Sequence, residues 1–330
     1  MIKVSLIIAM ALTGWVSMAS AQEFIRPMHT YSIVARDPLT GELGVAVQSH
    51  WFSVGTVVSW AEAGVGAVAT QSLADPAYGP LGLELMRAGK TAEEALKGLL
   101  AADAHPEIRQ VAMIDAHGRV AAHTGEKCIP RAGHIVGDTF SVQANLMLSE
   151  QVWPAMADAY RNATGDLADK MLAALDAAQS AGGDIRGQQS AALLIVSGTS
   201  TGRPWVDRLM DLRVEDHPDP LRELRRLVNV HRAYQHMNAG DAAIERGDFE
   251  RARQEYSAAE AMIPDNLETS FWHAVNLVNA GRLEDALPLF QKIFVKDPNW
   301  AVLTPRLIQV DLLKIDAEGL KHILRVAPEK

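Results

Sequence analysis

Residues 30–49, TYSIVARDPLTGELGVAVQS, have the pattern of two strands joined by a tight turn. Apolar side chains alternate with other side chains along both halves, which is the period of a β-strand. Asp37-Pro38 disfavours continued extension and Gly41 tolerates a positive φ, so residues 38–42 are expected to form the turn. A hairpin this apolar is expected at the buried centre of a sheet and not at its edge.

The segments that follow the hairpin alternate between strands and two separate blocks of helices. Strands are predicted at 57–60, 64–72, 109–114, 120–124, 139–146 and 190–196, with short strands near 205–206 and 212–214, and helices at 81–87, 91–102, 151–162 and 167–181. Residues 125–137 are expected to form a loop. Because helices do not alternate one for one with strands, the pattern favours an α+β fold with antiparallel sheets packed face to face and helices outside.

The last third of the chain repeats itself with a period of 34 residues. The matching pairs are Gly247 with Gly281, Phe249 with Leu283, Ala252 with Ala286, Tyr256 with Phe290 and Pro264 with Pro298. This spacing is that of the tetratricopeptide repeat, in which small residues allow two antiparallel helices to pack closely. Ala274 stands where the first copy has Gly240. We therefore predict an all-α repeat domain over 221–330, which could recruit a protein partner or self-associate, or simply stabilise the chain.

The composition and the first residues limit the classes of function and the cellular compartments that are compatible with this chain. The net charge of −9 argues against a nucleic-acid partner, and a single cysteine, Cys128, rules out an intrachain disulfide. Cys128 lies beside Lys127 and Arg131, which could lower its pKa, but a lone cysteine of this kind is expected to be a bystander or a packed thiol. Residues 1–21 resemble a secretory signal peptide, so a periplasmic or secreted protein with a short leader at 22–29 is expected. No later stretch is long and apolar enough for a membrane span.

Seven segments together resemble the domain-of-unknown-function 1028 family over about residues 30–232. They are TYSIVARDPLTGELGVAVQS, WAEAGVGAVATQS, DPAYGPLGLELM, HTGEKCIPRAGH, QANLM, QQSAALLIV and DLRVEDHPDP. That family is similar in fold to the N-terminal-nucleophile (Ntn) hydrolases. The resemblance implies a four-layer α-β-β-α sandwich over 30–220, followed by the helical repeats.

The resemblance also implies a catalytic role for Thr30. In Ntn hydrolases the first residue of the mature chain attacks an amide carbonyl, and its own α-amine is the base. Here Met28 and His29 precede Thr30, so a cut after His29 is required. The alternative is that Thr30 has no catalytic role and that its hydroxyl, at the start of a strand, makes a local hydrogen bond.

Other candidate site residues are polar groups at the ends of predicted strands. Asn145 is the predicted oxyanion donor, and the predicted substrate-binding set is Gln48, Ser49, Thr70, Gln71, His123 and Thr124. Each of these could instead be a satisfied polar group at a strand end. The spacing of His105, His117, His123 and His134 matches no compact metal motif, so neither a metal nor a cofactor is expected.

The sequence thus favours a secreted amidohydrolase acting on a small amide or peptide-like bond. The alternative is a non-catalytic binding protein, in which the sandwich holds a ligand and the helical repeats recruit a partner.

Overall fold

The computed structural model describes residues 30–328, and the predicted signal peptide and leader lie outside this range. Its central feature is the expected hairpin of β1 (Thr30–Arg36) and β2 (Leu43–Ser49), paired from Thr30↔Ser49 to Arg36↔Leu43. Gly41 has a φ of 78°, and the Asp37 carboxylate accepts hydrogen bonds from two turn amides. The turn chemistry therefore fixes the register of the hairpin.

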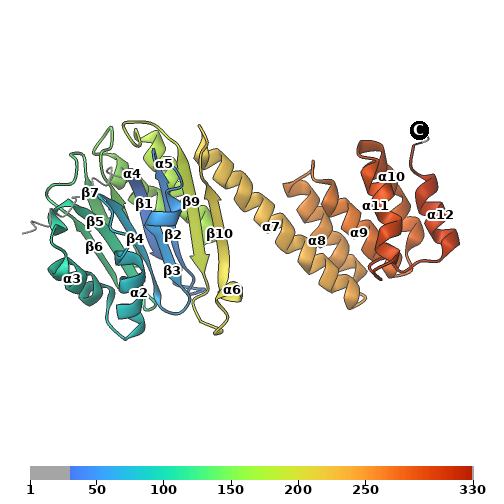
Figure 1. Ribbon diagram of the computed structural model, residues 1–330, viewed down its shortest axis with the longest axis horizontal. Coiled ribbons are helices and arrows are strands. Elements are labelled where there is room, and N and C mark those ends of the chain that lie inside the picture. Colours follow the sequence, from blue (N-terminus) through green and yellow to red (C-terminus); the bar gives the residue numbers. More distant parts are fainter. Residues whose placement is uncertain (1–29, 329–330) are drawn as a thin grey trace, which may run out of the picture.

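Two antiparallel sheets pack against each other (Figure 1). The larger has the order β10-β9-β2-β1-β8-β7, which places the hairpin at its centre as predicted, and the smaller has the order β3-β4-β5-β6. The remaining strands are β3 (Ser59–Glu62), β4 (Gly66–Ser72), β5 (Arg109–Asp115), β6 (Val120–Thr124), β7 (Gly133–Val136), β8 (Phe140–Ala144), β9 (Ser190–Val196) and β10 (Arg208–Val214).

Three local predictions are wrong in whole or in part. Of the strand predicted at 57–60, Val57 and Val58 belong to a short helix, and only Ser59 and Trp60 belong to β3. The segment 125–137, expected to be a loop, contains edge strand β7, whose short GHIV sequence carries a weak strand signal. The segment near 205–206, expected to be a strand, forms the short helix α6 (Pro204–Asp207), because Pro204 suits the first position of a helix. Residues 208–214 then form one continuous strand, β10.

The core between the sheets is built from small and β-branched side chains. Val34, Val45 and Val47 of the hairpin face Ala67 and Ala112 of the smaller sheet. Alanine allows the two sheets to approach closely, and the short helix α1 (Gly55–Val58) closes one side of this core. The inward face of the hairpin is therefore the face that carries Thr30, Ser32 and Val34.

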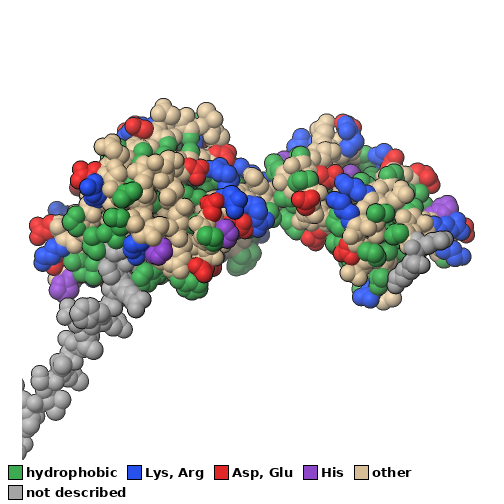
Figure 2. Space-filling view, turned by 90° about the horizontal axis from the view of Figure 1, so that it is seen from above, with side chains coloured by type: hydrophobic (Ala, Val, Ile, Leu, Met, Phe, Trp, Pro, Cys, Tyr) green, Lys and Arg blue, Asp and Glu red, His purple; other side chains and the backbone are tan. Residues whose placement is uncertain are grey.

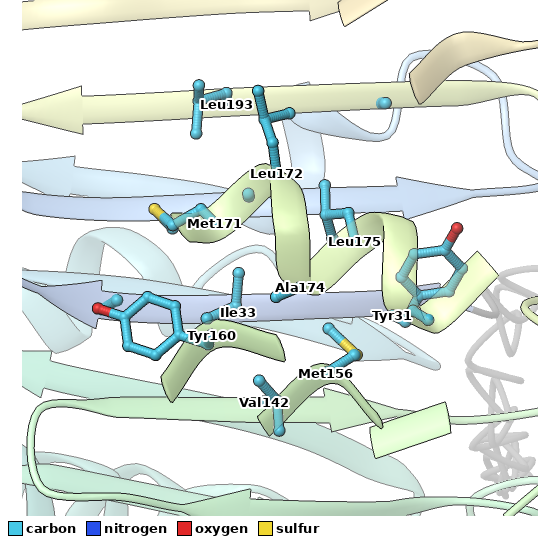
Figure 3. Packing of buried hydrophobic residues seen from close by; sticks show 14 of the residues in the cluster. Tyr31, Ile33, Val142, Met156, Tyr160, Met171, Leu172, Ala174, Leu175 and Leu193 are labelled. Carbon is cyan, nitrogen blue, oxygen red and sulfur yellow. The ribbon is translucent and has the colours of Figure 1, made fainter. Parts of the chain in front are cut away.

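Helices cover the outer faces of both sheets. Helices α2 (Tyr78–Arg87) and α3 (Ala92–Ala102) pack on the smaller sheet, and a 3₁₀ turn at Pro106–Ile108 leads into β5. Helices α4 (Val152–Asn162) and α5 (Leu167–Ser180) pack on the larger sheet. Figure 3 shows Met171, Leu172 and Leu175 of α5 lying over the strands that carry Tyr31, Ile33 and Leu193.

The C-terminal region is helical and is joined to the sandwich by one long helix, α7 (Pro220–Glu245). Leu224 and Val228, in its first half, belong to the core on the outer face of the larger sheet, whereas Ala233 and Met237 pack with Ala259. The predicted boundary at 220/221 thus falls at the start of a helix that both parts share. Figure 2 shows the two parts as lobes joined by a narrow neck.

The other helices of this region are α8 (Phe249–Met262), α9 (Leu267–Asn279), α10 (Leu283–Lys296), α11 (Asn299–Ile308) and α12 (Ala317–Arg325). Gly247 and Gly281 both adopt a positive φ just before a helix, and Tyr256 and Phe290 are both fully buried. No helix within residues 30–328 combines the length and the apolar character needed to cross a bilayer.

Candidate functional site

A cluster of buried amides and hydroxyls lies between the sheets, at the end where β1 begins. Because side chains alternate along a strand, Thr30 and Ser32 share the inward face with Val34. The same alternation along the smaller sheet turns Gln71 of β4 and Gln110 of β5 toward them, since their neighbours Ala69 and Ala112 belong to the core between the sheets.

Thr30 is fully buried and is bonded through both its backbone and its side chain. Its hydroxyl donates to Ser49 Oγ at 3.1 Å, directly across the hairpin. Its carbonyl oxygen accepts from Gln71 Nε2 at 3.1 Å and from the backbone N–H of Asn145 at 3.2 Å. The first residue of β1 is therefore held by three different strands or strand ends.

Gln110 is the centre of the cluster. Its Oε1 accepts from Gln71 Nε2 at 2.7 Å and from Asn145 Nδ2 at 2.9 Å. Its Nε2 donates to Thr124 Oγ1 and to the carbonyl of Ala144, each at 2.9 Å. Further in, Ser32 Oγ donates to Gln71 Oε1 at 2.6 Å and accepts from Gln143 Nε2 at 2.6 Å. These bonds satisfy polar groups that would be costly to bury alone.

One histidine reaches the cluster from the edge of the larger sheet. His134 of β7 lies with its Nδ1 2.8 Å from Thr124 Oγ1. Burial, with a smaller contribution from nearby His123, lowers the pKa of His134 below its ordinary value. The imidazole is therefore neutral around pH 7, and the hydrogen-bonded cluster consists of uncharged groups at that pH.

Strained backbone gathers at this same end of the sandwich. Ser53, Ser72, Arg131 and Leu146 have φ between 56° and 73°, a region that residues other than glycine rarely adopt. Ser72 is the last residue of β4, Arg131 precedes β7, Leu146 follows β8, and Ser53 lies in the link between β2 and α1. Such strain persists where the surroundings enforce it, and it is concentrated at functional sites. The backbone conformations therefore indicate a functional site at the Thr30 end of the sandwich, and this indication does not depend on the side-chain cluster.

Of the predicted site residues, the structure brings together Thr30, Ser49, Gln71, Thr124 and Asn145. Three others lie on the opposite faces of their strands. Gln48 pairs with Tyr31 on the helix-covered face, Thr70 donates to the carbonyl of Asp75, and His123 Nε2 contacts the carbonyl of Pro106. The placement of these three beside Thr30 is corrected, because a strand end presents successive side chains to opposite faces.

The sequence reasoning missed Ser32, Gln110, Gln143 and His134. The available signal was a polar residue at an inward position of an otherwise apolar strand, as in RQVAMID and SVQA. A buried glutamine in such a strand requires partners and therefore indicates a network.

Two further sequence expectations concern Cys128 and metals. Cys128 is buried, as expected for a packed thiol, and burial raises its pKa, so the alternative of a pKa lowered by Lys127 and Arg131 does not hold. Within residues 30–328, no group of three or more His, Cys, Asp or Glu side chains is arranged to hold a metal ion.

The fold and the cluster together define an α+β protein whose two antiparallel sheets enclose a buried amide-and-hydroxyl site at one end. The model of a family of unknown function, DUF1028, matches residues 30–224, and the chain belongs to that family. The matched region begins at Thr30, the first residue of the central strand.

A crystal structure of protein SPO2555 from Silicibacter pomeroyi, of the same family, is similar to this chain. The two are 29% identical with a TM-score of 0.54, and the similarity covers 61% of this chain and 88% of that one. No curated protein matches the chain.

Proposed function

We propose that this protein is an exported Ntn-type amidohydrolase in which Thr30 is the nucleophile. The observation that carries the proposal is the position of Thr30: it opens the central strand, within a cluster of neutral donors, at the end where strained backbone gathers. The start of the family match at the same residue supports it. The four layers of helix and sheet agree with the Ntn-like sandwich that the resemblance implies.

The proposed chemistry needs a peptide cut between His29 and Thr30. The freed α-amine, whose ordinary pKa is about 7.7–8.0, then takes the proton from the Thr30 hydroxyl. Thr30 Oγ1 bonds to the carbonyl carbon of the substrate amide, and the amine leaving group departs with a proton. Asn145, opposite Thr30, is the donor that we assign to the developing oxyanion. Water then releases the acyl group.

The test combines the chemical N-terminus with a covalent probe. We expect intact mass of the protein purified from the cell envelope to show a chain that begins at Thr30. A peptide epoxyketone, which reacts with both the hydroxyl and the amine of an N-terminal threonine, should label this chain.

Thr30→Ala should abolish the labelling, whereas Thr40→Ala, in the exposed turn, should not change it. A chain that keeps residues 22–29 and still hydrolyses an amide would overturn the proposal.

The second candidate is a non-catalytic binding protein, which the complete burial of Thr30 favours. In this case α7 to α12 act as tetratricopeptide-like repeats that recruit a partner. The matching positions of Ala252 and Ala286, both buried, support such repeats. Thr30→Ala would then leave the recruitment of the partner unchanged, which a pull-down on full-length protein would show.

A further inference from the structure

A cavity lies at the end of the sandwich opposite Thr30. Val196, at the end of β9, pairs with Leu43, whereas Thr30 pairs with Ser49 at the other end of the hairpin. The cavity is lined in part by Val196 and has a volume of about 460 Å³, which is in the range of small-molecule sites. Its walls come from both sheets, with the end of β3 on the smaller sheet and the end of β9, α6 and the start of β10 on the larger. It is therefore separate from the cluster around Thr30.

Charged side chains of both signs line this cavity, and three of them are accessible. Glu62 of β3 and Arg87 of α2 form an ion pair, in which Arg87 Nε donates to Glu62 Oε1 at 2.8 Å. Arg208, the first residue of β10, lies with its Nη1 3.1 Å from Asp211 Oδ2. The side chains of Glu62, Arg87 and Arg208 are 38%, 51% and 56% exposed, so a ligand in the cavity can reach all three.

These side chains keep hydrogen-bonding capacity that their protein partners do not use. Arg208 contacts Asp211 through Nη1 and shares that carboxylate with Arg213, whose Nε donates to Asp211 Oδ1 at 3.0 Å. A guanidinium has five N–H donors, so most of those of Arg208 remain available. Each Glu62 oxygen accepts one bond from Arg87 and retains a second acceptor position. The cavity thus offers donors at Arg208 and acceptors at Glu62.

The fourth charged side chain in the wall is already occupied. Asp207 is buried, and its carboxylate accepts bonds from the Thr201 amide, the Thr201 hydroxyl and the Ser200 hydroxyl. Small and apolar side chains complete much of the wall, namely those of Ala61, Ala63, Val196 and Pro204. The cavity therefore combines an apolar surface with one accessible carboxylate and two accessible guanidinium groups.

The balance of charge in the wall favours a ligand that carries both signs. Two carboxylates and two guanidinium groups line the cavity, so their charges cancel. Glu62 would repel a simple anion, and Arg87 and Arg208 would repel a simple cation, whereas a zwitterion meets an opposite charge at each end.

We propose that this cavity binds a small zwitterion with a free ammonium and a free carboxylate, either an amino acid or a dipeptide. Arg208 binds the carboxylate, because planar guanidinium groups suit carboxylates, and Glu62 binds the ammonium. The inference does not rest on the proposed catalysis. It gives the protein a ligand site at the end of the sandwich remote from Thr30.

The probes are L-alanine and L-alanyl-L-alanine, each titrated into the full-length protein by isothermal titration calorimetry. We expect saturable binding, and the tighter of the two probes distinguishes an amino-acid site from a dipeptide site. The N-acetylated form of that probe lacks the ammonium and its carboxamide form lacks the carboxylate, so each should bind at least about tenfold more weakly. Thr30→Ala should bind like the wild type, so this test and the test of the proposed function fail independently.

Arg208→Gln should weaken binding of the tighter probe at least about tenfold but should leave the affinity for its carboxamide form unchanged, because only the partner of the carboxylate is lost. Glu62→Gln should weaken binding of the zwitterion but not of its N-acetylated form. Both side chains are more than a third exposed, so both variants should fold. Arg222→Gln, at a position of α7 that is 78% exposed, should change no affinity. The absence of saturable binding, equal binding of the N-acetylated form, or an unchanged affinity in Arg208→Gln would refute the assignment.

Discussion

At the scale of single residues, Gln110 holds the buried cluster together because it is both an acceptor and a donor for other strands. Gln110→Leu keeps the volume of the side chain but removes the acceptor for Gln71 and Asn145 and the donor to Ala144. Since unsatisfied buried polar groups cost about 1–3 kcal/mol each, we expect the free energy of unfolding to fall by about 2 kcal/mol.

Urea denaturation measures this change. The same replacement at exposed Gln254 should stay within about 0.5 kcal/mol of the wild type. Equal effects at the two positions would show that the cluster contributes nothing to stability.

At the scale of elements, one carboxylate joins the outer helices to the smaller sheet. Asp103, at the end of α3, accepts from Arg109 Nε of β5 at 2.7 Å and from the Tyr78 hydroxyl of α2 at 2.9 Å. Although burial acts to raise it, these bonds and that from the His105 amide hold the pKa of Asp103 below its ordinary value. The carboxylate form is therefore favoured by folding.

The sign of the pH dependence follows from this lowered pKa. The stabilisation is present above the ordinary aspartate pKa of about 3.9 and is lost as the pH falls through the lower pKa of the folded state. We expect Asp103→Asn to lower stability at pH 7 and to flatten the decline in the free energy of unfolding below about pH 4. Asp158→Asn, whose side chain is 74% exposed, should leave the pH profile unchanged. An unaltered profile in Asp103→Asn would contradict this assignment.

At the scale of the whole molecule, α7 belongs to two hydrophobic cores, one on the sandwich and one in the helical region. Phe290→Ala opens a cavity in the helical region, and we expect it to lower the stability of that region by about 3–5 kcal/mol. Leu224→Ala acts in the sandwich core and should cost about 2–5 kcal/mol there.

Differential scanning calorimetry should separate the two effects into different transitions. Leu39→Ala, in the turn of the hairpin where Leu39 is 93% exposed, should move neither transition. A single transition that shifts equally in Phe290→Ala and Leu224→Ala would show that α7 couples the two regions into one unit.

The amino-acid sequence by itself determined the hairpin, its turn and most of the other elements, because alternation, helical spacing and turn residues act locally. The predicted site grouped Gln48 with Ser49, although alternation along a strand turns such neighbours to opposite faces. Only the tertiary structure decided that the Ser49 face is the one between the sheets. It alone brought Gln71, Gln110 and Asn145 to Thr30, because that contact depends on the packing of one sheet on the other. Local pattern carries no information about which distant strands meet.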